Sequence, residues 1–328
     1  MSMALVPPPG QDDDVIVYDA LVAAGDSMLA LIDTDPGLDD ALALLFAWGS
    51  PQLELAGITT VAGNVPLAAA TRNVFRLLAL RGVRPRPPVA EGAAAPLARP
   101  LVTATRYHGA DGLGDLPDWP AAAGTPAPHD AARFIADAAR RVTEPLTLIA
   151  LGPLTNLALA LERDHEALRR LARVVVMGGA VDVPGNVTPA AEFNIHVDPE
   201  AAARVLAAGL ALDLVPLDAT RQAVLSRADL EAALRRRPGP LAERVSAFTR
   251  RGFRVDEGRG TPGMVLHDPL AVAAALDPTL VGWEATRLEI GPDGETRRVA
   301  GPANCRVARA VEVPRFLAVF LERLCPAS

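Results

Sequence analysis

Short apolar runs alternate along the chain with longer segments in which apolar residues recur at helical spacing. Runs of about four to eight apolar residues bounded by turn residues predict buried strands. We expect strands at residues 29–32, 53–60, 146–150, 173–177 and 212–216. We expect helices at residues 39–48, 68–81, 131–141, 155–162 and 199–208, and later at 228–235, 241–253, 269–276 and 314–323. This alternation is typical of a mostly parallel sheet covered by helices.

The rest of the pattern completes a single domain. Residues 286–290 and 306–311 are expected to be late strands at an antiparallel edge, and the Pro-, Ala- and Gly-rich segments 84–100 and 116–128 are expected to be loops over the carboxyl ends of the strands. No linker divides the chain. We therefore predict an α/β fold over residues 28–328, an open, mostly parallel, twisted sheet with helices on both faces. Residues 1–27 are expected to be an extension outside this domain, the alternative being an ordered element through 15–18.

The amino-acid composition limits the kinds of partner that the protein is expected to bind. Half of the 328 residues are hydrophobic but only 4% are aromatic, so Ala, Leu and Val must form most of the core. The net charge is −7, and no basic patch predicts binding to nucleic acid or to an anionic membrane. No apolar run reaches the ~18 residues of a membrane span. The N-terminal segment carries three aspartates where a signal peptide would be basic, so we expect a cytoplasmic protein.

The chain contains no lysine, and this excludes several chemistries. A phosphate-binding loop of the Walker type, a pyridoxal Schiff base and a lysine general base all require that side chain. The two cysteines, Cys305 and Cys325, are too few for a disulfide framework or a metal knuckle.

Four carboxylates stand within eight residues directly after the first expected strand: Asp33, Asp35, Asp39 and Asp40. Because like charges so close repel one another, they indicate a bound cation. Oxygen ligands with no His or Cys nearby favour Ca²⁺ or Mg²⁺ over zinc. Helix capping alone would account for one or two of these residues but not four.

Two other motifs with clustered aspartates do not fit. A calcium-binding helix–loop–helix starting at Asp33 needs Gly at its sixth position and Glu at its twelfth, where this chain has Leu38 and Leu44. A phosphatase of the haloacid dehalogenase type would need Thr or Val at Gly37, and a downstream lysine.

The segment DTDPGLDDA at residues 33–41 resembles the signature of the inosine–uridine-type nucleoside hydrolases. Further blocks resemble the same family in the same order: GITTVAGN at 57–64, LGPLTN at 151–156, VMGG at 176–179, AEFN at 191–194, DPEAA at 198–202 and VLHDP at 265–269. The resemblance covers the chain from about residue 28 onward. It implies a Ca²⁺-dependent enzyme that hydrolyses the N-glycosidic bond of ribonucleosides, and a homodimer or homotetramer.

The resemblance also implies a set of metal ligands. Asp35, Asp40 and Asp268 would bind Ca²⁺ through their side chains, and Leu151 through its backbone carbonyl. Asp35 would also remove a proton from the metal-bound water. Independently, Asp268 precedes Pro269, a residue favoured at the first helical position, which predicts Asp268 as a helix N-cap.

By the same resemblance the substrate would meet several polar side chains. Asp39 would bind the ribose 2′-hydroxyl, while Asp33 supports the neighbouring ligands. The other residues expected at the substrate are Asn64, Met177, Asn186, Glu192 and Asn194. Amide and carboxylate groups together complement hydroxyls, which both donate and accept hydrogen bonds.

Two histidines are expected at the leaving base. His267, beside Asp268, is the candidate general acid, and His108 is a second active-site histidine on a mobile loop. For stacking on the base, residues 246–264 offer only Phe248 and Phe253, with no Tyr or Trp. We therefore expect a pyrimidine-preferring or non-specific enzyme. The alternatives are a hydrolase of another N-ribosyl compound, and a non-catalytic nucleoside or ribose binder, which would not need the water-activating residues.

Overall fold

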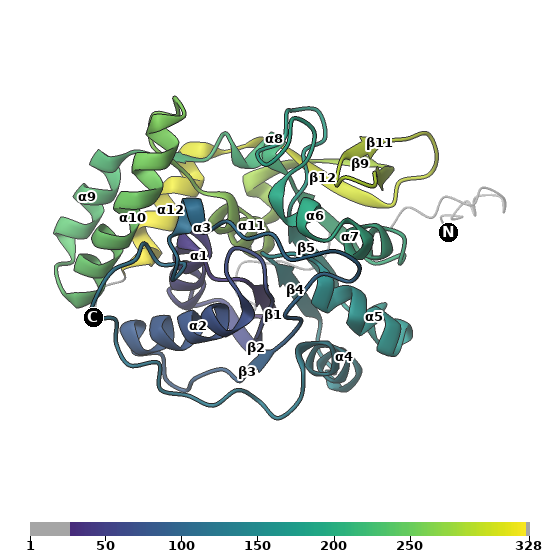
Figure 1. The fold of residues 1–328 in the computed structure, drawn as a ribbon, viewed down its shortest axis with the longest axis horizontal. Helices are drawn as coiled ribbons and strands as arrows, with labels where there is room; N and C mark the ends of the chain where they lie inside the picture. Colours follow the sequence, from purple (N-terminus) through teal and green to yellow (C-terminus); the bar gives the residue numbers. More distant parts are fainter. Residues whose placement is uncertain (1–26, 326–328) are drawn as a thin grey trace, which may run out of the picture.

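A central sheet of eight strands organises the protein, as shown by a computed structural model that describes residues 27–325 (Figure 1). The strand order is β3-β2-β1-β4-β5-β6-β12-β9. These strands are β1 Met28–Thr34, β2 Leu53–Thr60, β3 Val89–Glu91, β4 Leu146–Ala150, β5 Arg173–Met177, β6 Leu212–Val215, β9 Val281–Thr286 and β12 Cys305–Val311. All neighbours pair in parallel except β12 and β9, which are antiparallel. The predicted mostly parallel α/β sheet is confirmed.

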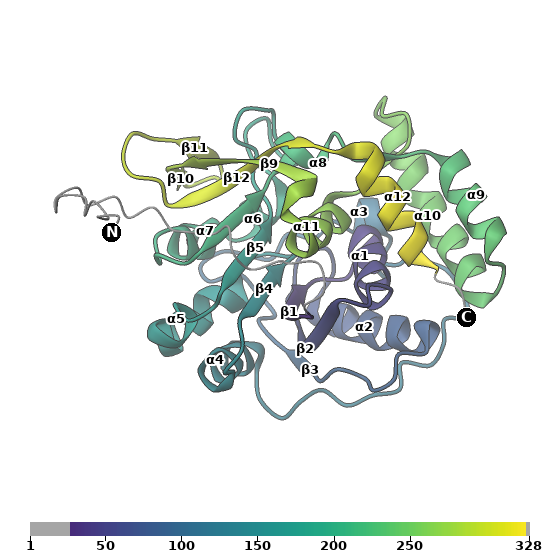
Figure 2. The same ribbon diagram turned by 180° about the vertical axis from the view of Figure 1, so that it is seen from behind.

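Helices cover both faces of this sheet (Figures 1 and 2). One layer contains α4 Ala131–Arg141, α5 Thr155–Leu168 and α7 Pro199–Leu206. The other contains α1 Leu38–Trp48, α2 Leu67–Arg81, α10 Pro240–Gly258, α11 His267–Leu276 and α12 Val313–Leu324. Successive strand residues point to opposite layers: in β5, Val174 and Val176 pack towards α5, while Val175 packs towards α11. Both faces of the strands are therefore apolar, as the continuous apolar runs predict.

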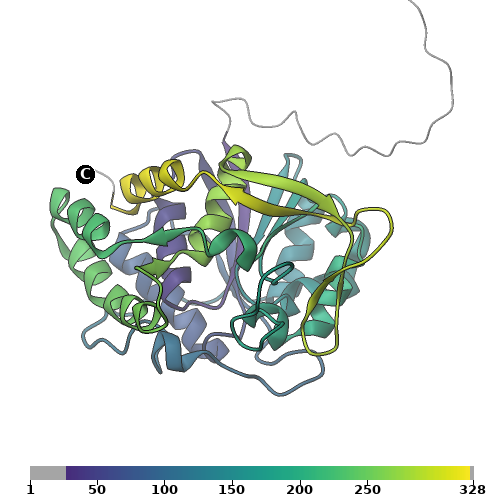
Figure 3. The same cartoon turned by 90° about the horizontal axis from the view of Figure 1, so that it is seen from above.

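Short elements complete the fold. They are α3 Thr105–His108, α6 Phe193–Val197, α8 Leu217–Thr220, α9 Arg227–Arg236, a 3₁₀ turn at Pro278–Leu280, and the strands β7 Val224–Leu225, β8 Met264–Val265, β10 Leu288–Ile290 and β11 Thr296–Arg298. Helices α9 and α10 lie at the opposite end of the molecule from the β10–β11 hairpin (Figures 1 and 3). Within residues 27–325, no helix is long and apolar enough to cross a membrane.

The predicted late strand 306–311 is confirmed as β12, whereas the other late strand and one early strand differ from the prediction. The antiparallel edge strand is β9, Val281–Thr286, whereas most of the predicted segment 286–290 forms β10 in a separate hairpin with β11. Strand β9 has little apolar alternation because it lies at the sheet edge, where Gly282 and Glu284 are exposed. Strand β3 lies inside the predicted loop 84–100, and its three residues are too few to give a pattern. The predicted extension at 1–27 lies, apart from residue 27, outside the described residues.

Candidate active site

Strand β1 delivers the carboxylate cluster to the carboxyl edge of the sheet, between β2 and β4. Asp39 and Asp40 lie in the first turn of α1, as predicted, whereas Asp33 lies within β1, which extends to Thr34 and past the predicted end at residue 32. Asp40 fixes the turn between them, because its Oδ2 accepts the backbone N–H of Gly37 at 3.0 Å and its Oδ1 accepts the hydroxyl of Thr34 at 2.6 Å. The side chain thus holds the start of α1 against the end of the strand.

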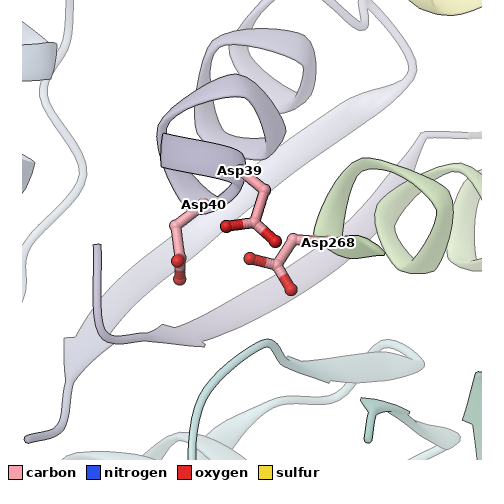
Figure 4. Close-up of side chains that lie close together, drawn as sticks. All are labelled: Asp39, Asp40 and Asp268. Atoms are coloured by element: carbon pink, nitrogen blue, oxygen red, sulfur yellow. The ribbon is translucent and has the colours of Figure 1, made fainter. Parts of the chain in front are cut away.

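Asp268 joins this cluster from the start of α11. Figure 4 shows the carboxylates of Asp39 and Asp268 pointing towards one another, with Asp40 beside them. All three residues are buried, and one carboxylate oxygen from each lies within 4.8 Å of the others. Asp268 is in the first turn of α11 and is not its N-cap, because the helix begins one residue earlier, at His267, with Leu266 as the cap. The contact depends on the packing of α11 against α1.

The side chain of Asp35 is enclosed by backbone. Its Oδ2 accepts the backbone N–H of Asn64 at 2.6 Å, and its Oδ1 has no hydrogen-bond partner among residues 27–325. A Cβ added to Gly63 or Gly152 would lie 2.1 or 2.7 Å from the Asp35 carboxylate oxygens. The absence of a side chain at these two glycines therefore leaves room for the Asp35 carboxylate. Asn64 also donates its Nδ2 to Asp40 Oδ2 at 3.0 Å, which links the two aspartates.

The electrostatics of the cluster favour a bound cation. Burial raises the pKa of Asp35, Asp39 and Asp268 well above the ordinary range, and the charges of the neighbouring carboxylates raise these pKa values further. Asp39 Oδ1, like Asp35 Oδ1, has no hydrogen-bond partner in the described part of the chain. Buried carboxylate oxygens that repel one another and lack donors fit a hard divalent cation.

Asp33 is supported by one residue of the neighbouring strand β2 and one of helix α5. Its Oδ1 accepts the hydroxyl of Thr59 at 2.5 Å and Nδ2 of Asn156 at 2.7 Å. Burial nevertheless raises its pKa to about 7. This carboxyl group therefore links the end of β1 to β2 and to the start of α5.

The backbone carbonyl of Leu151, just after β4, accepts Nδ2 of Asn194 at 2.7 Å. The same amide nitrogen donates to the carbonyl of Met177 at 3.2 Å. A carbonyl oxygen has two lone pairs, so Leu151 can still bind a cation. Because the Nδ2 group of Asn194 donates to these two carbonyls, its side-chain oxygen is the atom that remains for a substrate hydroxyl.

Two other predicted substrate residues hold the segment that leads into α6. Glu192 is the N-cap of α6 and accepts the backbone N–H groups of Gly179, Asn194 and Ile195 at 2.9–3.1 Å. Burial raises its pKa. Asn186 is exposed, and its Oδ1 accepts the backbone N–H of Phe193 at 3.0 Å. Both side chains therefore fix the backbone on which Asn194 stands.

His108 lies at the end of α3 and is buried, whereas the resemblance implied a mobile loop. Its Nδ1 lies 3.9 Å from Asp39 Oδ1 and accepts the backbone N–H of Leu38. Burial, with His267 and then Arg251, lowers the pKa of His108 to about 3. A neutral ring that accepts at Nδ1 carries its proton on Nε2, so His108 has a fixed N–H donor.

His267 is half-buried, and its Nδ1 lies 2.7 Å from the hydroxyl of Thr220. Burial, and then the charge of Arg221, lowers the pKa of His267 to about 4. The charge that His267 can carry also lowers the pKa of His108, which indicates that the two predicted histidines lie near one another.

Two polar residues at this site were missed by the sequence analysis. The hydroxyl of Tyr107 donates to Asp256 Oδ2 at 2.8 Å, and the charge of Asp256 raises the pKa of Asp39. Tyr107 could have been found as the neighbour of His108. Asp256 is a single acidic residue within a helix, and the sequence pattern does not distinguish it from an ordinary surface acid. In contrast, Phe248 and Phe253 lie in the hydrophobic core and offer no face to a base.

Comparison with known proteins shows which family the chain is similar to. The family model described as inosine-uridine preferring nucleoside hydrolase matches residues 30–318. A pyrimidine-specific ribonucleoside hydrolase, RihA, of Salmonella agona is 42% identical over 254 residues, which cover 76% of this chain and 80% of the relative. An uncharacterized protein of Schizosaccharomyces pombe is 40% identical over 312 residues, covering 90% and 99%. The solved structure of a purine-preferring ribonucleoside hydrolase from Gardnerella vaginalis is 31% identical, with a TM-score of 0.86 over 90% of this chain and 98% of that one.

Proposed function

This chain belongs to the inosine–uridine preferring nucleoside hydrolase family and is an N-glycosyl hydrolase of ribonucleosides, and we propose that it works with a Ca²⁺-bound water activated by an aspartate. The observation that carries the proposal is the buried set of carboxylates, whose repulsion needs a cation. A bound cation of this kind orients a water molecule and lowers its pKa.

The residues that would hold the cation are Asp35, Asp40, Asp268 and the carbonyl of Leu151. The partner-free Oδ1 of Asp35 is the atom that would take the proton of the attacking water. Because Asn64 fixes the other oxygen of Asp35, the carboxylate cannot rotate away from this task.

The ribose would lie against the same carboxylates. Asp39 would accept the 2′-hydroxyl, and Asn194 would meet the sugar through its side-chain oxygen. The remaining contacts proposed for the sugar come from Asn64, Met177, Asn186 and Glu192. Breaking the N-glycosidic bond leaves positive charge on the sugar, and buried carboxylates around the ring stabilise that charge.

The leaving base would meet His267 and His108. The lowered pKa values of about 3 and 4 favour neutral rings at pH 7, so each would first contact the base through an N–H group, in the case of His267 when its Nδ1 accepts the Thr220 hydroxyl. Transfer of a proton from His267 requires its pKa to rise once substrate is bound, and nearby negative charge acts in that direction.

For the base, we propose a preference for pyrimidines. The support is the identity to the pyrimidine-specific RihA, together with the absence of Trp from residues 246–264. The Gardnerella vaginalis enzyme, which prefers purines, is the relevant contrast. The proposed Ca²⁺ chemistry and base preference require a substrate test, while the cytoplasmic location and the homo-oligomer stay predictions.

A reducing-sugar assay across uridine, cytidine, inosine, adenosine and guanosine tests the activity. We expect ribose release in the presence of Ca²⁺, fastest from uridine or cytidine. Faster release from the three purine nucleosides would contradict the base preference. If no ribose is released from any of the five nucleosides, two alternatives remain: a hydrolase of another N-ribosyl compound, or a non-catalytic binder. Calorimetric titration of the same nucleosides would distinguish between them.

A further inference from the structure

One buried carboxylate connects the two segments that carry the histidines. Asp256, in α10, is only 6% exposed. Its Oδ2 accepts the hydroxyl of Tyr107 at 2.8 Å and the backbone N–H of Val265 at 3.0 Å. Tyr107 is next to His108, and Val265 is two residues before His267. A single oxygen atom of a third element thus holds both segments.

The same helix also fastens the His108 segment by a second side chain. Arg251, in α10, donates to the backbone carbonyls of Thr105, Arg106 and Tyr107 at distances of 2.8–3.4 Å. These three residues belong to α3, which has only four residues and is too short to be stable alone. The position of His108 therefore depends on α10 as well as on its own backbone.

We propose that Asp256 is a positioning residue, which sets the distance between His108 and His267 so that both N–H groups can reach one leaving base. This inference rests on the proposed function. Without Asp256, Tyr107 and Val265 would each lose a partner, and the two histidines would move independently. The loss would affect departure of the base, while the carboxylate cluster and the ribose contacts would remain.

The alternative is that the negative charge of Asp256 matters through its influence on Asp39. Two substitutions separate these roles. Asp256→Asn keeps an oxygen that can accept both hydrogen bonds and removes the charge, whereas Asp256→Ala removes both bonds. If Asp256 positions the histidines, the Asn variant should keep kcat/KM for uridine within about threefold, and the Ala variant should lose about tenfold or more, as two lost hydrogen bonds imply.

The leaving group provides the second readout. p-Nitrophenyl riboside needs no proton for departure, so the Ala variant should hydrolyse it within about threefold of wild type. A matched control is Asp277→Ala at the other end of α11, because Asp277 Oδ1 also accepts one backbone N–H and one hydroxyl, both from Thr279. This control should leave both substrates unaffected.

Equal losses on both substrates, or an Asn variant as impaired as the Ala variant, would overturn the inference. If Asp256→Ala does not fold, Tyr107→Phe removes only the hydroxyl bond and should give a smaller loss confined to uridine. An equal loss on both substrates, or no loss on either, would then overturn it. Wild-type protein that hydrolyses no nucleoside would instead contradict the proposed function.

Discussion

His108 accepts at Nδ1 the backbone N–H of Leu38, 2.9 Å away, across a sequence separation of 70 residues. The bond satisfies one of the free N–H groups at the start of α1. It also brings the imidazole ring so close to the turn that a Cβ on Gly37 would lie 2.4 Å from Nδ1. The turn that carries the carboxylates and the His108 segment therefore pack directly against each other.

This close approach predicts the effect of Gly37→Ala. The added methyl group must displace the His108 ring, so the free energy of unfolding should fall by about 1–3 kcal/mol, with a loss of uridine hydrolysis. Chemical denaturation and the ribose assay would measure both. Gly258→Ala is the control, because a Cβ there meets nothing within 4 Å, and it should leave activity unchanged. Unchanged stability and activity in Gly37→Ala would contradict the contact.

Removing one proposed ligand should remove the metal. We expect wild-type protein to contain bound calcium by elemental analysis, and Asp40→Ala to lose both calcium and activity. Asp229→Ala, which also changes an acid in the first turn of a helix, is the control and should keep both. Active, unchelated wild-type protein that contains no calcium would refute the site.

The pKa shifts predict how calcium affects stability with pH. A buried carboxyl group with a raised pKa contributes stability below its ordinary pKa, and this is lost as the pH rises through the folded value, about 7 for Asp33. His108 and His267 act oppositely, because their folded pKa values of about 3 and 4 make stability rise with pH up to about 6.5.

Above pH 6.5 the histidines no longer change the stability, and only the loss of stability caused by the buried carboxyl groups continues as the pH rises. Protein treated with a chelator should therefore lose melting temperature between pH 6.5 and 8, and added Ca²⁺ should restore more at pH 8 than at pH 5.5. Thermal unfolding with and without EGTA would measure this. A stabilisation by Ca²⁺ that does not grow with pH would contradict the coupling between protons and the cation.

The proposed ribose contacts predict discrimination against deoxynucleosides. A 2′-deoxyribose leaves Asp39 without its partner, and an unpaired buried polar group costs about 1–3 kcal/mol. Uridine should thus be hydrolysed at least about tenfold faster than 2′-deoxyuridine in kcat/KM. Equal rates for the two nucleosides would contradict the proposed contact between Asp39 and the ribose 2′-hydroxyl.

His267→Ala should reveal activation of the leaving group. General acids contribute about 10²–10⁴-fold, so turnover of inosine should fall by at least about 10²-fold. Hydrolysis of p-nitrophenyl riboside should fall much less, and calcium should stay bound. If turnover of both substrates falls by the same factor, His267 is structural or positions the sugar, and His108 becomes the candidate acid.

The sequence predicted those parts of the site that stand on regular elements. Strand β1, the turn at Pro36–Gly37 and the first turn of α1 follow from local pattern, so Asp39 and Asp40 were placed correctly. The partners of Asp256 and Arg251 could not be predicted, because they depend on how α10 packs against α3 and β8. The burial of Phe248 and Phe253 has the same cause: a helical pattern identifies an apolar face but not the element that covers it.

The order of the carboxylates along the chain bears on how the protein is made. Asp39 and Asp40 leave the ribosome early, whereas Asp268 follows only after most of the domain has been synthesised. Until α11 docks on α1, the early aspartates can remain hydrated and their repulsion is screened by water. The repulsion between Asp268 and the two early aspartates therefore arises only when α11 packs on α1, and we expect calcium present in a newly made chain to favour that step.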